Sequence, residues 1–111
     1  MSDLTDDDLF LMVNMHGRNT GLPMIVWLGP RGGARHAARI KVQMDHRDQM
    51  DRSNLAVVSV QDDPPRVIEG SLGAADLAAV RRWIVLNRQA ILDHWHEKTD
   101  GLELSQALKR L

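Results

Sequence analysis

The chain has 111 residues, of which 43% are hydrophobic and 26% charged, and it contains no cysteine. This length fits one domain rather than two, and the missing thiols exclude disulfide bridges, a thiolate zinc site and a cysteine nucleophile. The formal net charge of -1 argues against a globally basic nucleic-acid-binding protein. We therefore expect a single domain over residues 1–111, with its own hydrophobic core and no cofactor.

Residues 1–21 are predicted as an N-terminal extension of this domain. The segment begins with acidic residues, whereas a secretory signal begins with basic ones, so we expect a cytoplasmic protein. No apolar run approaches the roughly 20 residues that cross a bilayer, so no membrane contact is expected. Thr5 and Asp8 have the spacing of a capping box before a helix, but residues 11–15 suit a strand equally well. Residues 6–15 are therefore predicted as either helix or strand.

A buried strand is expected at residues 24–28, where five apolar side chains run without interruption to Gly29-Pro30. A glycine-containing loop follows. From Arg39 the pattern changes to alternation, which predicts a strand with one buried face and one face in water. The cations Arg39 and Lys41 then project together from the wet face.

The next elements are separated by polar turns. Residues 46–54 are predicted as a solvated loop, and the valine-rich residues 55–61 as a third strand that ends at the Asp-Asp-Pro-Pro sequence. Residues 66–70 can form a short fourth strand. Together these segments predict a small, mainly antiparallel sheet of about four strands.

Residues 74–97 give the clearest signal, a long amphipathic helix. Apolar side chains recur with a period near 3.6, and no glycine or proline interrupts them. About 23 helical residues would span about 35 Å, enough to cover a small sheet. The expected stripe consists of Leu77, Val80, Ile84, Asn87, Ile91 and Trp95. With a short terminal helix at 102–111, these elements predict an α+β fold whose sheet packs against one long C-terminal helix.

This order of elements resembles a bacterial family catalogued as domain of unknown function 4160. The matching features are the apolar strand at 24–28, the Glu-Gly-Ser-Leu junction at 69–72, and a helix that carries Trp83 and ends near Trp95. The family-like core covers residues 22–97. The resemblance implies a small protein of a toxin-antitoxin-like operon with no settled activity. Where the family loop reads Pro-Pro-His-x-His, this chain retains only the second histidine, His36.

A basic cluster lies in the loop after the first buried strand and in the strand that follows. Guanidinium groups bind phosphates and carboxylates bidentately, and glycines let a backbone approach a ligand closely. The cluster is therefore a candidate contact for an acidic protein partner or nucleic acid, although the solvated face of an edge strand would have the same composition. Its members are Arg31, Arg35, His36, Arg39 and Lys41.

An apolar set is a candidate interface. A sheet covered by one helix leaves its other face to be hidden, either by a second copy in a homodimer or by the two terminal segments of the same chain. The set consists of Phe10, Trp27, Trp95, Leu104 and Leu108. A metal site is not expected, because His94 and His96 lie about 200° apart around a helix.

Taken together, these patterns favour a non-enzymatic binding module with a protein partner encoded by a neighbouring gene. One alternative is a small nuclease-like toxin in which His36 is the general base and Arg35 or Arg39 holds the phosphate. Another alternative is a structural homodimer subunit without a ligand.

Overall fold

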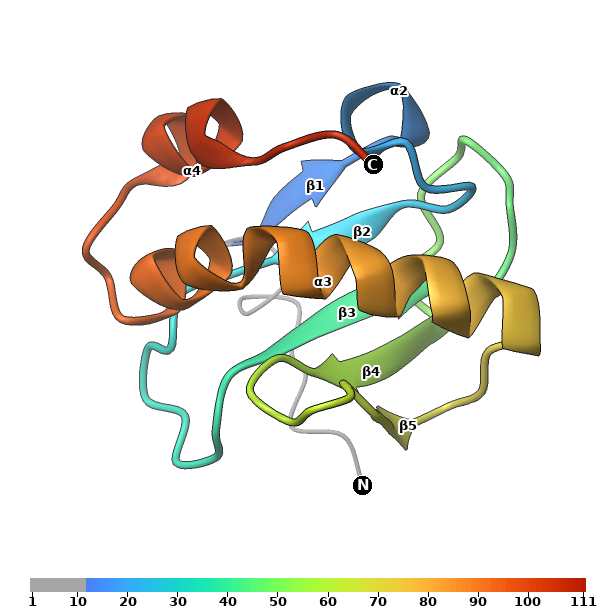
Figure 1. Cartoon of the computed structure of the whole chain (residues 1–111), viewed down its shortest axis with the longest axis horizontal. Coiled ribbons are helices and arrows are strands. Elements are labelled where there is room, and N and C mark those ends of the chain that lie inside the picture. Colours follow the sequence, from blue (N-terminus) through green and yellow to red (C-terminus); the bar gives the residue numbers. More distant parts are fainter. Residues whose placement is uncertain (1–11) are drawn as a thin grey trace.

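Five short strands pair in the order in which they follow one another along the chain (Figure 1). The computed structural model describes residues 12–111, and every neighbouring pair of strands in it is antiparallel. The strands are β1 (Val13–Met15), β2 (Val26–Leu28), β3 (Arg39–Gln43), β4 (Leu55–Ser59) and β5 (Val67–Glu69). The predicted α+β class with an antiparallel sheet is confirmed. The sheet has one strand more than the expected number of about four.

The additional strand comes from the segment that the sequence left undecided. Val13 pairs with Leu28 and Met15 with Val26, so β1 forms the edge of the sheet beside β2. Residues 6–11, including the predicted interface residue Phe10, lie outside the described residues. A four-residue helix, α2 (Gly17–Thr20), follows and ends at Gly21, whose φ of 79° lies in the left-handed region that favours glycine.

The long helix α3 (Ala74–Trp95) lies across one face of the sheet (Figure 1). Its buried side chains include Val80, Ile84 and Ile91 from the predicted stripe, and they pack in one core with Ile40 and Val42 of β3. Burying an aliphatic side chain of this size contributes about 1.5 to 3 kcal/mol. The helix and the sheet therefore hold each other in place through these contacts.

The chain after α3 returns over the same core. α4 (Gly101–Ala107) is capped by Asp100, which forms a complete capping box with Glu103, and Leu104 of this helix is buried. The helix ends at Ala107, earlier than the expected residue 111. The last residues continue in extended form toward α2, where the Leu111 N–H donates to the Thr20 carbonyl at 2.7 Å.

The second face of the sheet differs from the expected wet surface. The register places Trp27, Lys41 and Val57 side by side across β2, β3 and β4, and Trp27 and Val57 are only 2% and 4% exposed. β3 does alternate, since Ile40 and Val42 are buried and Arg39 and Lys41 are half-buried. The alternating pattern of β3 therefore predicted correctly which side chains share a face. The face that carries Arg39 and Lys41, however, is largely shielded from water.

Candidate functional site

The loop between β2 and β3 carries two exposed arginines on a backbone fixed to α3. The Arg31 N–H donates to the Trp95 carbonyl at the end of α3, at 2.8 Å. Inside the loop, Arg31 Nε donates to the Ala34 carbonyl at 2.9 Å, and the Ala34 N–H returns a bond of the same length to Arg31. Arg31 and Arg35 are both exposed, and no carboxylate of residues 12–111 forms an ion pair with either one.

His36 lies against α3 at the base of this loop. Its ring centroid is 5.5 Å from that of Trp95, with the two planes tilted by 38°. Nδ1 lies 3.0 Å from the Ala37 carbonyl, and since a carbonyl oxygen only accepts, Nδ1 is the donor of this bond. His36 is half-buried, and its contact with Trp95 connects the loop to the end of α3.

The two cations of β3 belong to a different environment from the loop arginines. Arg39 and Lys41 are half-buried on the face that carries Trp27. Arg39 Nε is buried and has no hydrogen-bond partner in the part of the chain that the structure describes. The predicted basic cluster is therefore divided, with Arg31, Arg35 and His36 in the loop and the two strand cations on the sheet.

The residues of the predicted apolar interface are mostly inside the chain. Trp27, Trp95 and Leu104 are buried, and Trp95 and Leu104 pack in the core between α3 and the sheet. Leu108 is half-buried and packs against the same core. These four side chains stabilise the fold and do not form an exposed apolar patch.

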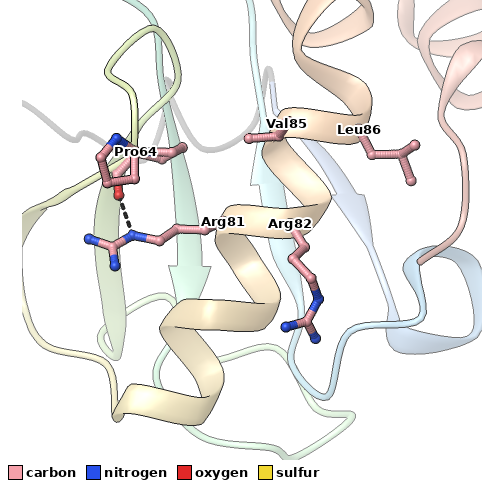
Figure 2. A pocket seen from close by; sticks show the side chains of 6 residues that line it. Pro64, Arg81, Arg82, Val85 and Leu86 are labelled. Atoms are coloured by element: carbon pink, nitrogen blue, oxygen red, sulfur yellow. Dashed lines mark hydrogen bonds between the residues drawn. The ribbon is translucent and has the colours of Figure 1, made fainter.

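An open groove runs along the outer side of α3, on residues that the sequence reading did not select (Figure 2). Its volume is about 400 Å³. One wall comes from the connection between β4 and β5 and the other from consecutive turns of α3. The lining residues are Pro64, Pro65, Arg81, Arg82, Val85 and Leu86.

The loop after β3 is rich in carboxylates, which are engaged in internal contacts. Asp48 accepts a hydrogen bond from His16, which lowers the pKa of this carboxyl, and His46 Nε2 lies 2.8 Å from an oxygen of Asp76 at the start of α3. These pairs tie the loop to α2 and to α3. Within the described residues, no three histidine or acidic side chains come together as metal ligands would.

Comparisons with known proteins do not assign this chain to a family. No protein-family model matches it, and no curated protein or solved structure is detectably similar to it. The resemblance to domain of unknown function 4160 therefore stays a prediction. Among residues 12–111, no helix is both long and apolar enough to cross a membrane.

The groove was missed because it depends on contact between parts of the chain that are distant in sequence. The sequence predicts a turn at residues 64 and 65, and for the long helix it predicts the buried stripe. One signal was present in the sequence. Val85 and Leu86 are apolar although they lie outside the predicted stripe, and Arg81 and Arg82 precede them by one helical turn. An apolar pair outside the core stripe of a helix is typical of a contact surface.

Proposed function

We propose that this protein is a non-enzymatic binding module whose loop between β2 and β3 binds an acidic surface of a partner protein. The observation that carries the proposal is the pair of exposed arginines, Arg31 and Arg35, on a loop fixed to the end of α3. Because the loop backbone is held by hydrogen bonds, little conformational entropy is lost when the guanidinium groups bind carboxylates.

Two other exposed arginines of the described chain are already engaged in ion pairs. Arg47 is paired with Asp45 and Asp51, and Arg66 with Asp62. Such pairs satisfy the guanidinium donors within the chain, so these arginines are less available to a partner. Arg31 and Arg35 are thus stronger candidates for an intermolecular contact than Arg47 and Arg66.

An acidic protein suits this surface better than nucleic acid. Single-stranded nucleic acid is held largely by stacking on exposed aromatic rings, and all three tryptophans, Trp27, Trp83 and Trp95, are buried. The chain also has no tyrosine and a net charge of -1, so a long phosphate backbone would meet few cations. We further propose that the protein acts in the cytoplasm and that a neighbouring gene encodes the partner, as in toxin-antitoxin-like systems.

The test compares partner capture by charge-reversed variants. The full chain, carrying an affinity tag, is expressed in its native host beside a variant with Arg31→Glu and Arg35→Glu, and bound proteins are identified by mass spectrometry. We expect an acidic protein to be captured by the unmodified chain and to be reduced at least tenfold with the variant. Expression of the chain alone is expected to leave growth and cellular RNA intact.

A matched control reverses two other exposed cations, Lys109→Glu and Arg110→Glu, which produces the same change in net charge. These residues lie at the C-terminal end of the chain beside α2, away from the loop. We expect this control to capture as much partner as the unmodified chain. Equal losses with both variants, or recovery of RNA or DNA in place of an acidic protein, would contradict the proposal.

A further inference from the structure

The outer side of α3 presents an apolar pair to solvent. Val85 is 53% exposed and Leu86 44% exposed, while the neighbouring Trp83 and Ile84 are fully buried. Exposed apolar side chains are common singly, but contiguous ones beside a concave surface mark interaction sites. Figure 2 shows Val85 on the side of the helix that carries Arg81 and faces Pro64, and Leu86 on the other side, where Arg82 also projects.

The groove beside this pair is built by a fixed contact between α3 and the connection from β4 to β5. Arg81 Nε donates to the Pro65 carbonyl at 2.7 Å (Figure 2). This bond uses one N–H of the Arg81 guanidinium and fixes the position of the side chain. Its other N–H groups remain available to donate to a ligand. Pro64 and Pro65 form the apolar wall opposite Val85.

The charge of the groove is of one sign. The charged residues that line it are Arg81 and Arg82, and no acidic residue is among the lining side chains. Asp62, in the same connection between strands, is engaged by Arg66 at 2.8 Å. A symmetric contact between two copies through this groove would bring their arginines together, which is unfavourable.

We propose that this groove binds an acidic amphipathic segment of a partner protein. Apolar side chains of the segment pack on Val85 and Leu86 against the proline wall, and its carboxylates accept hydrogen bonds from Arg81 and Arg82. Apolar anchors at helical spacing, flanked by charges of one sign, are the usual way in which a helix binds in a groove. The surface is separate from the loop that carries Arg31 and Arg35, so the two proposals stand or fall independently.

The test uses a synthetic helical peptide in which leucines occupy one face and glutamates the rest. Binding is followed by the methyl NMR signals of Val85 and Leu86 and by fluorescence anisotropy of the labelled peptide. We expect saturable shifts of these methyl signals. Arg82→Glu and Leu86→Ser are each expected to weaken binding at least tenfold, and both residues are exposed, so the fold is kept.

The control variant, Arg110→Glu, makes the same charge change at an exposed residue outside both proposed surfaces and is expected to alter peptide affinity by less than twofold. A matched peptide with lysine in place of every glutamate is expected to bind at least tenfold more weakly. The proposal is overturned if the methyl signals do not shift, if Arg82→Glu binds as the unmodified chain does, or if both peptides bind equally. A dimer that Arg82→Glu abolishes would also overturn it, because the occupant would then be a second copy.

Discussion

A buried amide, that of Gln43 at the end of β3, organises the loop that follows. Its side chain is fully buried, and Nε2 donates to Asp45 Oδ1 at 2.7 Å and to the Gln49 carbonyl at 2.9 Å. Its carbonyl oxygen accepts from the Asp51 N–H at 3.0 Å. Because a buried amide without partners is unfavourable, these bonds hold the loop against the strand. Most of residues 46–54 are exposed, as expected for a solvated loop, and one buried residue of the preceding strand orders them.

Asp45 is the charged centre of the same network, and its ionisation should make the stability of the protein depend on pH. Hydrogen bonds from Arg47 and then from Gln43 hold the pKa of this carboxyl far below its ordinary value. Since the folded pKa is lower than the unfolded one, its stabilising effect is complete above about pH 4 and is lost as the pH falls further. We expect Asp45→Asn to lower Tm by several degrees at pH 7, with the difference shrinking steadily below pH 4.

Thermal unfolding followed by circular dichroism between pH 7 and pH 2 measures this difference. Asp63→Asn is the control, because Asp63 is exposed and makes no hydrogen bond or ion pair with the described residues. Its Tm should follow that of the unmodified chain at every pH. A Tm difference for Asp45→Asn that stays constant down to the lowest pH would mean that shape, rather than charge, causes the loss.

At the scale of elements, the turn that follows α3 contains a residue in an unfavourable conformation. Glu97 has a φ of 61°, and its N–H donates to the His94 carbonyl while the Lys98 N–H donates to that of Asp93. This is the Schellman pattern, which usually has glycine at the left-handed position. We expect Glu97→Gly to raise the free energy of unfolding by about 0.5 to 1 kcal/mol, measured by urea denaturation.

Glu97→Ala separates the backbone effect from the loss of a negative charge near the C-terminal end of a helix, where anions are unfavourable. Alanine removes the carboxylate and keeps the strained φ, so it should give less than half of the gain seen with glycine. Equal gains from alanine and glycine would assign the whole effect to charge.

The elements that the sequence predicted well are those with a repeating pattern. The alternation of β3 and the stripe of α3 each extend over several residues, so their periods could be recognised. β1 and α2 comprise three and four residues, which is too short for any period. The second sheet face was mispredicted as wet because alternation shows which side chains share a face but not what covers that face.

The same difference applies to the candidate sites. The loop arginines were found because their chemistry is visible in one short stretch of sequence. The groove was not found, since it arises where residues 64 and 65 meet α3, and the Arg81 bond that shapes it joins residues 16 positions apart. Contacts of this kind are set by how the elements pack, which neither composition nor periodicity reports.

At the scale of the whole molecule, the C-terminal residues join parts of the fold that are far apart in sequence. Asn87, buried in α3, donates through Nδ2 to the Lys109 carbonyl at 3.0 Å and accepts from the Lys109 N–H at 2.6 Å. Two residues later, Leu111 bonds to Thr20 beside β1. The last residues therefore link the central helix to α2, the short helix that follows the edge strand β1 (Figure 1).

Breaking this link should loosen the C-terminal residues before it affects the core. Asn87→Ala leaves the Lys109 N–H and carbonyl without partners and should lower the free energy of unfolding by about 1 to 3 kcal/mol. Amide hydrogen exchange at Lys109 and Leu111 should become at least tenfold faster, while β3 and β4 amides keep their protection relative to global unfolding. Combining Asn87→Ala with removal of residues 109–111 tests the cause. If Lys109 is the main partner, Asn87→Ala should lower the free energy of unfolding less in the shortened chain than in the full one. An equal decrease in both chains would assign the effect to the bond between Asn87 and the Trp83 carbonyl.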